Sequence, residues 1–314
     1  MARSTLSPVA SSGTDRQPMP ERSLATHIFL SLRPAQWTKN LLVFAGLLFG
    51  RRLFDPASLL HAGSAFAVFC ALSGVVYIVN DIADRRGDRL HPLKAQRPIA
   101  SGALAVPIAA GVALALAAAS LVVAFTIGPA FAAVAAAYLA LQILYSFLLK
   151  HIVIIDVLTI AIGFVLRAVG GAVAVRVEIS HWLLVCTILL ALVIALAKRR
   201  HEIVLLSAGA VGHRPILGEY SAYLLDQMIG VVTASTLISY VFYTISPETQ
   251  AKFGTAWLGL TIPFPLYGIF RYLYVVHQRE GGGSPADLLL TDRPLLACVA
   301  LWALTVALII YRPV

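Results

Sequence analysis

Charged residues are scarce in this chain of 314 residues: they make up 12% of it, whereas hydrophobic residues make up 59%. Water-facing domains have roughly 45–50% apolar and about 25% charged residues. The mean hydropathy is +0.85, and many apolar runs approach about 20 residues, the length that an α-helix needs to cross a bilayer. This composition argues against a water-soluble globular protein and indicates a polytopic membrane protein.

Cysteine is scarce as well, and Cys70, Cys186 and Cys298 each lie inside an apolar run. Their positions show no metal-ligand spacing, which argues against a disulfide framework or a zinc site. The sequence also has no Gly-rich nucleotide loop, no nucleophile elbow and no early basic region followed by an apolar core, as a signal peptide would require. Residues 1–25, which are rich in Ser, Pro, Arg and Gly, are predicted to form a disordered cytoplasmic tail.

The apolar runs predict nine membrane-spanning helices, because backbone groups in lipid must be paired within their own segment. The expected spans are residues 40–54, 57–79, 103–127, 129–149, 152–175, 181–197, 225–246, 255–276 and 294–312. A polar loop, residues 198–223, separates the sixth span from the seventh. We therefore expect an all-α membrane protein in which residues 26–314 form a nine-transmembrane-helix bundle.

The basic residues are distributed unevenly about these spans. With the N-terminus placed in the cytoplasm, 18 of the 24 Lys and Arg residues lie on the cytoplasmic side, five lie on the opposite side and Arg167 lies within a span. This bias follows the positive-inside rule. The net charge of +9 thus reflects topology and does not indicate a nucleic-acid partner. We expect a multi-pass protein of the plasma (inner) membrane with a cytoplasmic N-terminus.

Negative charge is concentrated in one stretch, Asn80-Asp81-Ile82-Ala83-Asp84-Arg85-Arg86-Gly87-Asp88, which follows the second span. If the helix continues through it, Asp81, Asp84 and Asp88 lie at i, i+3 and i+7, on one face. Three stacked carboxylates repel each other unless they share a cation, and Mg²⁺ favours carboxylate oxygens together with substrate phosphates. The pattern favours a Mg²⁺–phosphate site formed by Asn80, Asp81, Asp84 and Asp88 over a solvated helix end.

Basic and polar side chains on the same side are candidates to hold phosphate oxygens. They lie next to the predicted spans: Lys39, Lys94, Arg97, Tyr145, Lys150, Lys198 and Arg199. Each of them alone also fits a simpler interpretation, as a positive-inside charge, a snorkelling anchor or an interfacial aromatic. Together with the aspartates they predict a cleft that opens to the cytoplasm.

Two ionisable residues, Asp156 and Arg167, lie inside the fifth span. Such intramembrane residues are candidates for function. Their separation corresponds to about 16 Å of helical rise, so they share a face without bonding to each other, and each needs another partner. A role in the site is favoured over a structural ion pair with another helix.

The motif Asn80-Asp81-x-x-Asp84-x-x-x-Asp88 on such a hydrophobic chain resembles the UbiA superfamily of intramembrane prenyltransferases, over roughly residues 30–312. The resemblance implies that the motif binds a Mg²⁺-diphosphate. Most members that prenylate aromatic acceptors have a second Asp-rich motif after the sixth helix, where this chain has Lys198-Arg199-Arg200-His201-Glu202. A basic cluster binds phosphate directly, which suggests a substrate with an additional phosphate.

Further likenesses point to one branch of the superfamily, which transfers 5-phosphoribosyl from phosphoribosyl diphosphate to a polyprenyl (decaprenyl-type) phosphate and releases diphosphate. They are Arg33-Pro34-x-Gln36-Trp37-x-Lys39-Asn40, His91-Pro92-x-Lys94-x-x-Arg97-Pro98, Tyr145-Ser146 with Leu149-Lys150, Arg167-Ala168 and Lys198-Arg199. In that branch the product supplies arabinose precursors for the cell envelope.

The resemblance implies a role for each candidate. Asp81 and Asp84 would be catalytic through the metal, and Asp156 would contact a ribose hydroxyl or orient Arg167 or Lys150. The residues expected to bind substrate are Lys39, Asn80, Lys94, Arg97, Tyr145, Lys150, Arg167, Lys198 and Arg199.

Two other functions compete with phosphoribosyl transfer. The first is an ordinary prenyltransferase that moves an isoprenoid from its diphosphate to an aromatic or other acceptor, and the missing second Asp motif counts against it. The second is a non-enzymatic membrane transporter. Against it, the charges gather on one side and the spans have no clear inverted repeat.

Overall fold

The computed structural model describes residues 23–91, 94–207, 215–278, 288 and 291–311, and all the regular elements in these ranges are helical. The predicted all-α class is therefore confirmed for the described part of the chain. The first helix, α1, comprises Leu24–Ser31. Most of the predicted tail, residues 1–22, lies outside the described residues.

Seven helices in the described ranges are long and apolar enough to cross a membrane. They are α3 (Pro56–Ala83), α6 (Val106–Ile127), α7 (Pro129–Phe147), α8 (Ile155–Ala174), α9 (His181–Ser207), α10 (Ala222–Ile245) and α14 (Arg293–Tyr311). An eighth crossing results if α11 (Pro247–Phe253) is joined to η5 (Trp257–Thr261) and α12 (Pro263–Gln278), across a bend of 101°. Proline in the first turn of α3, α6 and α7 fits the preference for proline at helix starts.

The predicted first span, residues 40–54, differs from a single α-helix. A 3₁₀ helix, η1, covers Pro34–Phe44, and the short α2 covers Ala45–Phe49. A 3₁₀ helix rises about 2.0 Å per residue against about 1.5 Å for an α-helix, so residues 34–49 extend roughly 30 Å. That length matches the hydrocarbon core of a bilayer, although the segment is too short for an α-helical span. The count of nine crossings stays a prediction.

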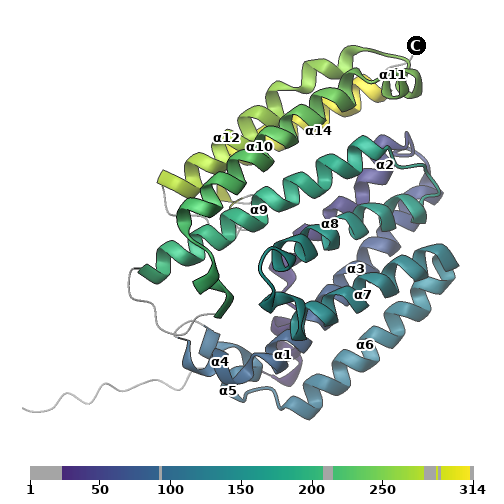
Figure 1. Ribbon diagram of the computed structural model, residues 1–314. Helices are drawn as coiled ribbons and strands as arrows, with labels where there is room; N and C mark the ends of the chain where they lie inside the picture. The colour runs from purple at the N-terminus through teal and green to yellow at the C-terminus, as the bar shows by residue number, and fades with distance from the viewer. Residues whose placement is uncertain (1–22, 92–93, 208–214, 279–287, 289–290, 312–314) are drawn as a thin grey trace, which may run out of the picture.

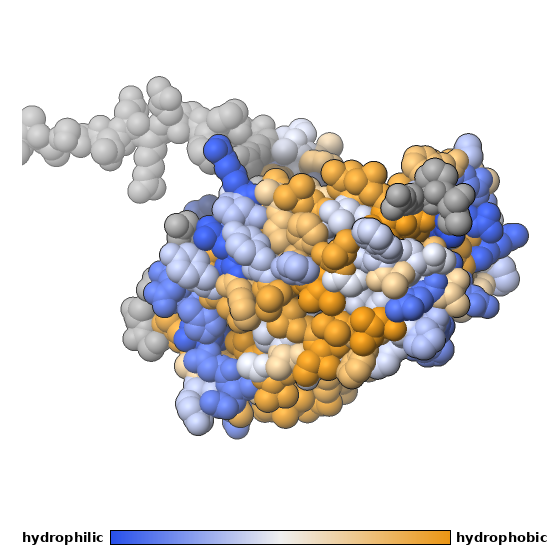
Figure 2. All heavy atoms as spheres, turned by 90° about the horizontal axis from the view of Figure 1, so that it is seen from above, coloured by the Kyte–Doolittle hydropathy of each residue, from blue (hydrophilic) through white to orange (hydrophobic). Residues whose placement is uncertain are grey.

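The long helices lie side by side, and short elements gather at their ends (Figure 1). One end carries α1, α4 (Arg85–Leu90) and α5 (Pro98–Ser101), whereas α2 and α11 lie at the other. Figure 2 shows hydrophilic side chains at both ends of the molecule and a broad hydrophobic belt between them. This distribution is the one expected of a protein whose middle faces lipid. We call the end with α1, α4 and α5 the charged end.

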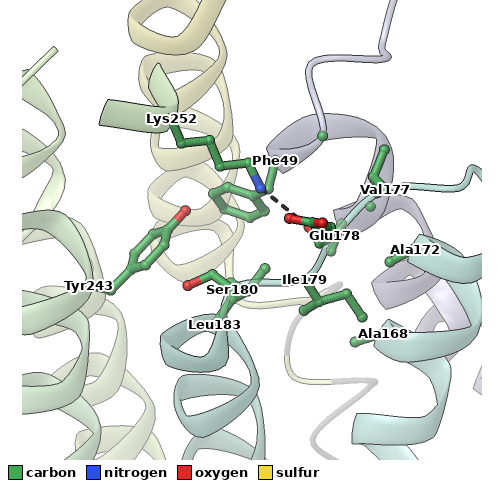
Figure 3. Close-up of a pocket in the computed structure, with 13 residues that line it drawn as sticks. Phe49, Ala168, Ala172, Val177, Glu178, Ile179, Ser180, Leu183, Tyr243 and Lys252 are labelled. Carbon is green, nitrogen blue, oxygen red and sulfur yellow. Dashed lines mark hydrogen bonds between the residues drawn. The ribbon is translucent and has the colours of Figure 1, made fainter. Parts of the chain in front are cut away.

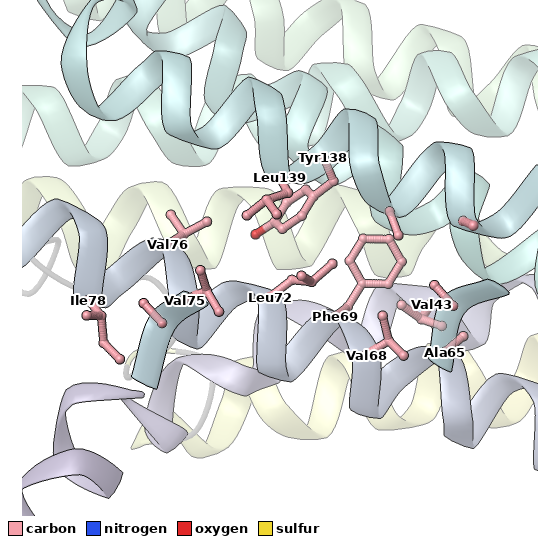
Figure 4. Close-up of a cluster of buried hydrophobic side chains, with 14 of the residues drawn as sticks. Val43, Ala65, Val68, Phe69, Leu72, Val75, Val76, Ile78, Tyr138 and Leu139 are labelled. Atoms are coloured by element: carbon pink, nitrogen blue, oxygen red, sulfur yellow. The ribbon is translucent and has the colours of Figure 1, made fainter. Parts of the chain in front are cut away.

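The largest buried cluster joins η1, α3, α6 and α7 (Figure 4). Its centre is Phe69, whose ring meets those of Phe131 and Tyr138 edge to face, with centroids 5.9 and 5.3 Å apart. A second buried cluster, built mainly from α9, α10 and α12, includes Val157 from the start of α8. The helix α8 thus contributes to both halves of the bundle, and this gives the residues near its start a fixed place between them.

The contact between η1 and α8 is so close that one position requires glycine. A Cβ atom on Gly171 would lie 1.9 Å from the Val43 carbonyl oxygen, whereas a Cβ on Gly230 of α10 would meet no atom within 4 Å. The close approach of Val43 to Gly171 fixes the position of η1 against α8. Because η1 begins next to Arg33, the same contact also fixes how η1 runs from Arg33 into the core.

We expect Gly171→Ala to destabilise the folded protein by about 1–3 kcal/mol, because the added methyl group forces η1 and α8 apart. The measurement is thermal unfolding of the purified protein in detergent. Gly230→Ala is the matched control, and its melting temperature should be unchanged or slightly raised, since alanine favours helix. Equal melting temperatures for the two variants would contradict the close packing.

Candidate functional site

Asp81 lies close to the end of α3 and is 2% exposed. Its carboxylate accepts a hydrogen bond from Arg33, between α1 and η1, and a second one from Arg97 Nη1 at 3.1 Å. The Arg33 guanidinium also lies over the Tyr77 ring, 4.7 Å from its centroid. A buried carboxylate is costly unless it is paired, so these two arginines draw α1 and the segment after α4 onto the end of α3.

Asp88 lies on α4 and shares Arg97 with Asp81, since the same Nη1 atom donates to Asp88 Oδ2 at 2.6 Å. Other arginines position the segment that carries Arg97. Arg85 Nε donates to the Ile99 carbonyl at 3.2 Å, and Arg89 Nε donates to the Ala100 carbonyl at 2.9 Å. These bonds fold α5 back onto α4 and direct Arg97 toward the two aspartates.

Asp84 has a different environment because α3 ends at Ala83, and Asp84 itself has φ −89° and ψ 3°. Its Oδ1 accepts a hydrogen bond from Lys150 Nζ at 2.6 Å, and its Oδ2 accepts one from Asn80 Nδ2 at 3.1 Å. The sequence predicted that the three aspartates share a face if the helix continues. The helix breaks at Asp84, so Asp81 and Asp88 share one cation and Asp84 faces another.

These residues fit Mg²⁺ by the chemistry of their donors. Among the residues that the structure describes, no three His, Cys, Asp or Glu side chains converge as a ready metal cage. Mg²⁺ does not need such a cage, since it uses one or two carboxylates and completes its coordination with water and phosphate oxygens. The Asp81 and Asp88 carboxylates, held around one cationic nitrogen, already have the proximity that a shared cation requires.

The other buried pair of the charged end is Asp156 with Arg199, 0% and 1% exposed. Arg199 Nε donates to Asp156 Oδ2 at 2.8 Å, its Nη1 donates to Glu202 at 2.8 Å, and its Nη2 donates to the Tyr145 hydroxyl at 3.2 Å. Asp156 thus has the interhelical ion pair that the sequence analysis ranked second. Its catalytic role stays a prediction.

Arg199 lies on a helix and not in the predicted loop, since α9 continues to Ser207, beyond the predicted end at residue 197. Lys198 and Arg199 belong to this extension. Lysine, arginine and glutamate are good helix formers, and the Arg199–Glu202 pair has the i,i+3 spacing that supports a helix. The cationic cluster is therefore held on a regular element and points its arginine at α8.

Arg167 is buried in the bundle interior, where it joins three elements. Its Nε donates to Asn40 Oδ1 at 2.7 Å, its Nη2 to the Tyr138 hydroxyl at 2.7 Å and its Nη1 to the Gly163 carbonyl at 3.0 Å. The guanidinium also lies 4.8 Å from the Tyr138 ring centroid. As expected, Arg167 and Asp156 have separate partners. These contacts tie η1, α7 and α8 together, and a role of Arg167 in substrate binding stays a prediction.

The remaining candidates lie on elements that carry or adjoin the network. Lys39 is on η1, Lys94 on η2 (Lys94–Gln96), Lys150 on η3 (Leu149–His151) and Lys198 on α9. Lys150 is buried, whereas the other three lysines are half-buried. The network thus consists of two adjoining groups, one of Asp81, Asp84 and Asp88 with their partners and one of Asp156 with its partners. The η3–α8 segment links the two groups.

Sequence reasoning did not include Arg33, Glu202 and Tyr220 among the site residues. The Tyr220 hydroxyl donates to Asp156 Oδ1 at 2.8 Å, and burial raises the pKa of Tyr220 to about 12, so its proton is in place at neutral pH. Arg33 could have been found from its place before Pro34 at an expected membrane interface. Tyr220 had no local signal, because 64 residues separate it from Asp156.

A small cavity of about 20 Å³ lies away from the charged end, among α2, α8, α9 and α11 (Figure 3). Gly46, Ser180 and Tyr243 are among its lining residues, and beside it Lys252 Nζ donates to the Glu178 carbonyl at 3.3 Å. A cavity of this size holds about one water molecule. None of its described lining residues is a predicted site residue, so it is separate from the charged network.

The fold and the site define a polytopic helical membrane protein with a mixed acidic and basic network at one end. The model of the UbiA prenyltransferase family matches residues 40–203. Decaprenyl-phosphate phosphoribosyltransferase of Corynebacterium glutamicum is 33% identical to this chain over 302 residues, which cover 95% of this chain and 90% of that protein. The enzyme of the same name from Mycolicibacterium smegmatis is 32% identical, with coverage of 93% and 95%. The chain belongs to the UbiA prenyltransferase family, which confirms the resemblance.

A solved structure agrees with the fold. A UbiA homolog from Archaeoglobus fulgidus bound to GPP and Mg²⁺ superimposes with a TM-score of 0.71 at 20% identity, covering 90% of this chain and 99% of that chain. At this identity the likeness establishes a common fold. The helical bundle is thus shared by proteins whose sequences have diverged widely.

We expect Asp156→Ala to destabilise the protein by about 3–5 kcal/mol, because Arg199 loses a fully buried partner. The matched control is Asp226→Ala. Asp226 pairs with the neighbouring Arg200, with Nη2 and Oδ2 3.3 Å apart, but its side chain is 39% exposed. An exposed pair contributes about 0–1 kcal/mol. Chemical unfolding in detergent measures the free energy of unfolding of both variants. Equal destabilisation would contradict the larger contribution expected of the buried pair.

Proposed function

We propose that this protein transfers the 5-phosphoribosyl group of phosphoribosyl diphosphate to a polyprenyl phosphate, with release of diphosphate, at the cytoplasmic face of the plasma membrane. The relatives that are 32–33% identical over more than nine-tenths of this chain carry the name of such an enzyme. The matches cover at least nine-tenths of this chain and of each of these two relatives, so the likeness is not confined to one segment.

The observation that carries the proposal is the mixed charge of the site. Three carboxylates, Asp81, Asp84 and Asp88, lie against basic side chains from separate elements. A metal-bound diphosphate needs carboxylates, whereas a phosphate monoester needs basic groups that bind it directly. A site for phosphoribosyl diphosphate and a lipid phosphate needs both kinds, which this end of the bundle provides.

We assign Mg²⁺ to Asn80, Asp81, Asp84 and Asp88, on the donor side of the site. When bound there, the metal neutralises the charge of the leaving diphosphate. The carboxylates would then hold the donor through its diphosphate. This assignment uses the oxygen donors described above. The basic side chains are then assigned to the phosphate groups that the metal does not hold.

The basic residues are assigned to the two remaining phosphate groups, the 5-phosphate of the donor and the phosphate of the lipid. Arg97 and Lys150 border the aspartates, and Arg199, with Lys198 beside it, borders Asp156. We assign this set, with Lys39 and Lys94, to the 5-phosphate of the donor and to the phosphate of the lipid. Tyr145, which accepts a hydrogen bond from Arg199, supports that arginine from α7.

The reaction forms a bond between a lipid phosphate oxygen and C1 of the ribose while the bond from C1 to the diphosphate oxygen breaks. The attacking phosphate is already an anion at neutral pH, so the step needs no strong general base. The residues therefore act by orientation and charge compensation, which are the main contributions a protein makes to such group transfer. Asp156, whose Oδ2 accepts a hydrogen bond from Arg199 at 2.8 Å, is in a position to orient that arginine, and its contact with a ribose hydroxyl stays a prediction.

The topology suits a lipid acceptor. With α1, α4 and α5 on the cytoplasmic side, η1 supplies a ninth crossing and the charged end opens to the cytoplasm. The polyprenyl chain then lies along the hydrophobic belt of Figure 2, with its phosphate at the level of the charged network.

The test uses purified protein in detergent with Mg²⁺, a polyprenyl phosphate and radiolabelled phosphoribosyl diphosphate. Label should enter the organic phase only when both metal and lipid phosphate are present, and EDTA should prevent it. Prenyl transfer from an isoprenoid diphosphate to an aromatic acid, without any labelled lipid, would overturn the proposal and assign the other chemistry of the superfamily.

In the same assay, Asp81→Asn and Asp84→Asn should each lower turnover by at least about 100-fold, since each removes charge from the side that holds the metal. Asp55→Asn is the control on the same helix. Asp55 precedes α3 at its far end, and asparagine also suits that position before a helix, so its turnover should equal that of the unaltered protein. Near-normal turnover in both site variants would disprove the metal assignment.

A further inference from the structure

The backbone just before α8 has a conformation that its residue does not favour. Ile154 has φ 69° and ψ −43°. A β-branched residue rarely adopts positive φ, because its Cβ atom crowds the backbone. These angles are close to those of a γ-turn of the rare, strained kind. Such a conformation persists only where surrounding contacts hold it.

The contacts that hold this turn come from Tyr220, which lies two residues before the start of α10. The Ile154 amide donates to the Tyr220 hydroxyl oxygen at 2.7 Å, and the same hydroxyl donates to Asp156 Oδ1 at 2.8 Å. One phenol thus uses its acceptor and its donor on two residues of the same turn. Tyr220 is 5% exposed and belongs to the buried cluster that contains Val157 and Ile216, so its ring is held in place.

Groups assigned to phosphate binding lie on both sides of the turn. Lys150, four residues before Ile154, donates to Asp84 at 2.6 Å. Asp156, two residues after Ile154, accepts from Arg199 at 2.8 Å. Any change in the Ile154 backbone therefore moves Lys150 relative to the Asp156–Arg199 pair. The turn sets the spacing between the two groups of charges.

We propose that Tyr220 is a positioning residue of the site, which holds the Ile154 turn through its hydroxyl and so fixes the spacing between Lys150 and the Asp156–Arg199 pair. The inference rests on the proposed function in one respect, namely that these cations hold the 5-phosphate of the donor. Tyr220 acts through them and touches no substrate. Its effect is thus expected on donor binding and not on the chemical step.

The first test is Tyr220→Phe, which removes the hydroxyl and keeps the ring. In the transfer assay the apparent KM for phosphoribosyl diphosphate should rise about tenfold while kcat changes less than about twofold, the pattern of lost binding that is uniform between ground state and transition state. Tyr223→Phe is the control, because it makes the same change three residues away at a side chain that is 75% exposed. It should leave both constants unchanged.

The second test is rescue by Ile154→Gly. Glycine adopts positive φ at no steric cost, so the turn no longer depends on the phenol, and the Ile154 side chain is already 47% exposed. The double variant Tyr220→Phe/Ile154→Gly should regain a KM within about twofold of the unaltered protein. A tyrosine that contributes only to overall stability would show no such rescue. An unchanged KM in Tyr220→Phe, or no rescue in the double variant, would overturn the proposal.

These experiments distinguish a failure to fold, and a failure of the proposed reaction, from a failure of the role proposed for Tyr220. If Tyr220→Phe does not fold but the double variant folds with a normal KM, the proposal stands, and if neither folds it is wrong. Calorimetric titration with phosphoribosyl diphosphate and Mg²⁺, without the lipid phosphate, follows donor binding without turnover, and Tyr220→Phe should bind the donor about tenfold more weakly than Tyr223→Phe. An unaltered protein that binds phosphoribosyl diphosphate but transfers no label would refute the proposed function, while the difference in donor binding between Tyr220→Phe and Tyr223→Phe would still test Tyr220.

Discussion

The cost of placing a charge in an apolar bundle governs the arrangement of this protein. A carboxylate or guanidinium removed from water must be paired or hydrogen-bonded, and in a membrane the alternatives are fewer still. Asp81, Asp156, Lys150 and Arg199 are all nearly inaccessible, and each has an opposite charge on another element. The ion pairs therefore determine which helices meet at the charged end, and the apolar side chains fill the space between them.

This constraint gives the basic residues two kinds of environment. Arg167 is held by an amide, a hydroxyl and a carbonyl oxygen, and these neutral groups fix it within the core. Arg97 and Lys150 are held by carboxylates that also suit a metal ion. An arginine inside a span is thus not a phosphate ligand by virtue of its charge alone. Its partners decide whether it supports the scaffold or borders the site.

Much of this was predictable from the sequence because hydropathy runs and local spacing report on the helices directly. The long helices, the cluster at Asp81 to Asp88 and the separate partners of Asp156 and Arg167 all followed from such patterns. The extension of α9 and the break at Asp84 did not, since they depend on ion pairs formed between elements. The role of Tyr220 could not be predicted from the sequence for a similar reason, because only folding brings its hydroxyl to the start of α8.

The 3₁₀ helix η1 has a consequence for how this segment tolerates change. Every third residue of a 3₁₀ helix returns to the same side, and Asn40 and Val43 of η1 are both buried. The number of residues in this segment therefore sets the distance between Arg33 at the charged end and Asn40 beside Arg167, at about 2 Å per residue. Insertion of one residue would rotate everything beyond it by a third of a turn and withdraw Asn40 from its arginine. Length, more than the identity of the exposed side chains, is the property that this segment must keep.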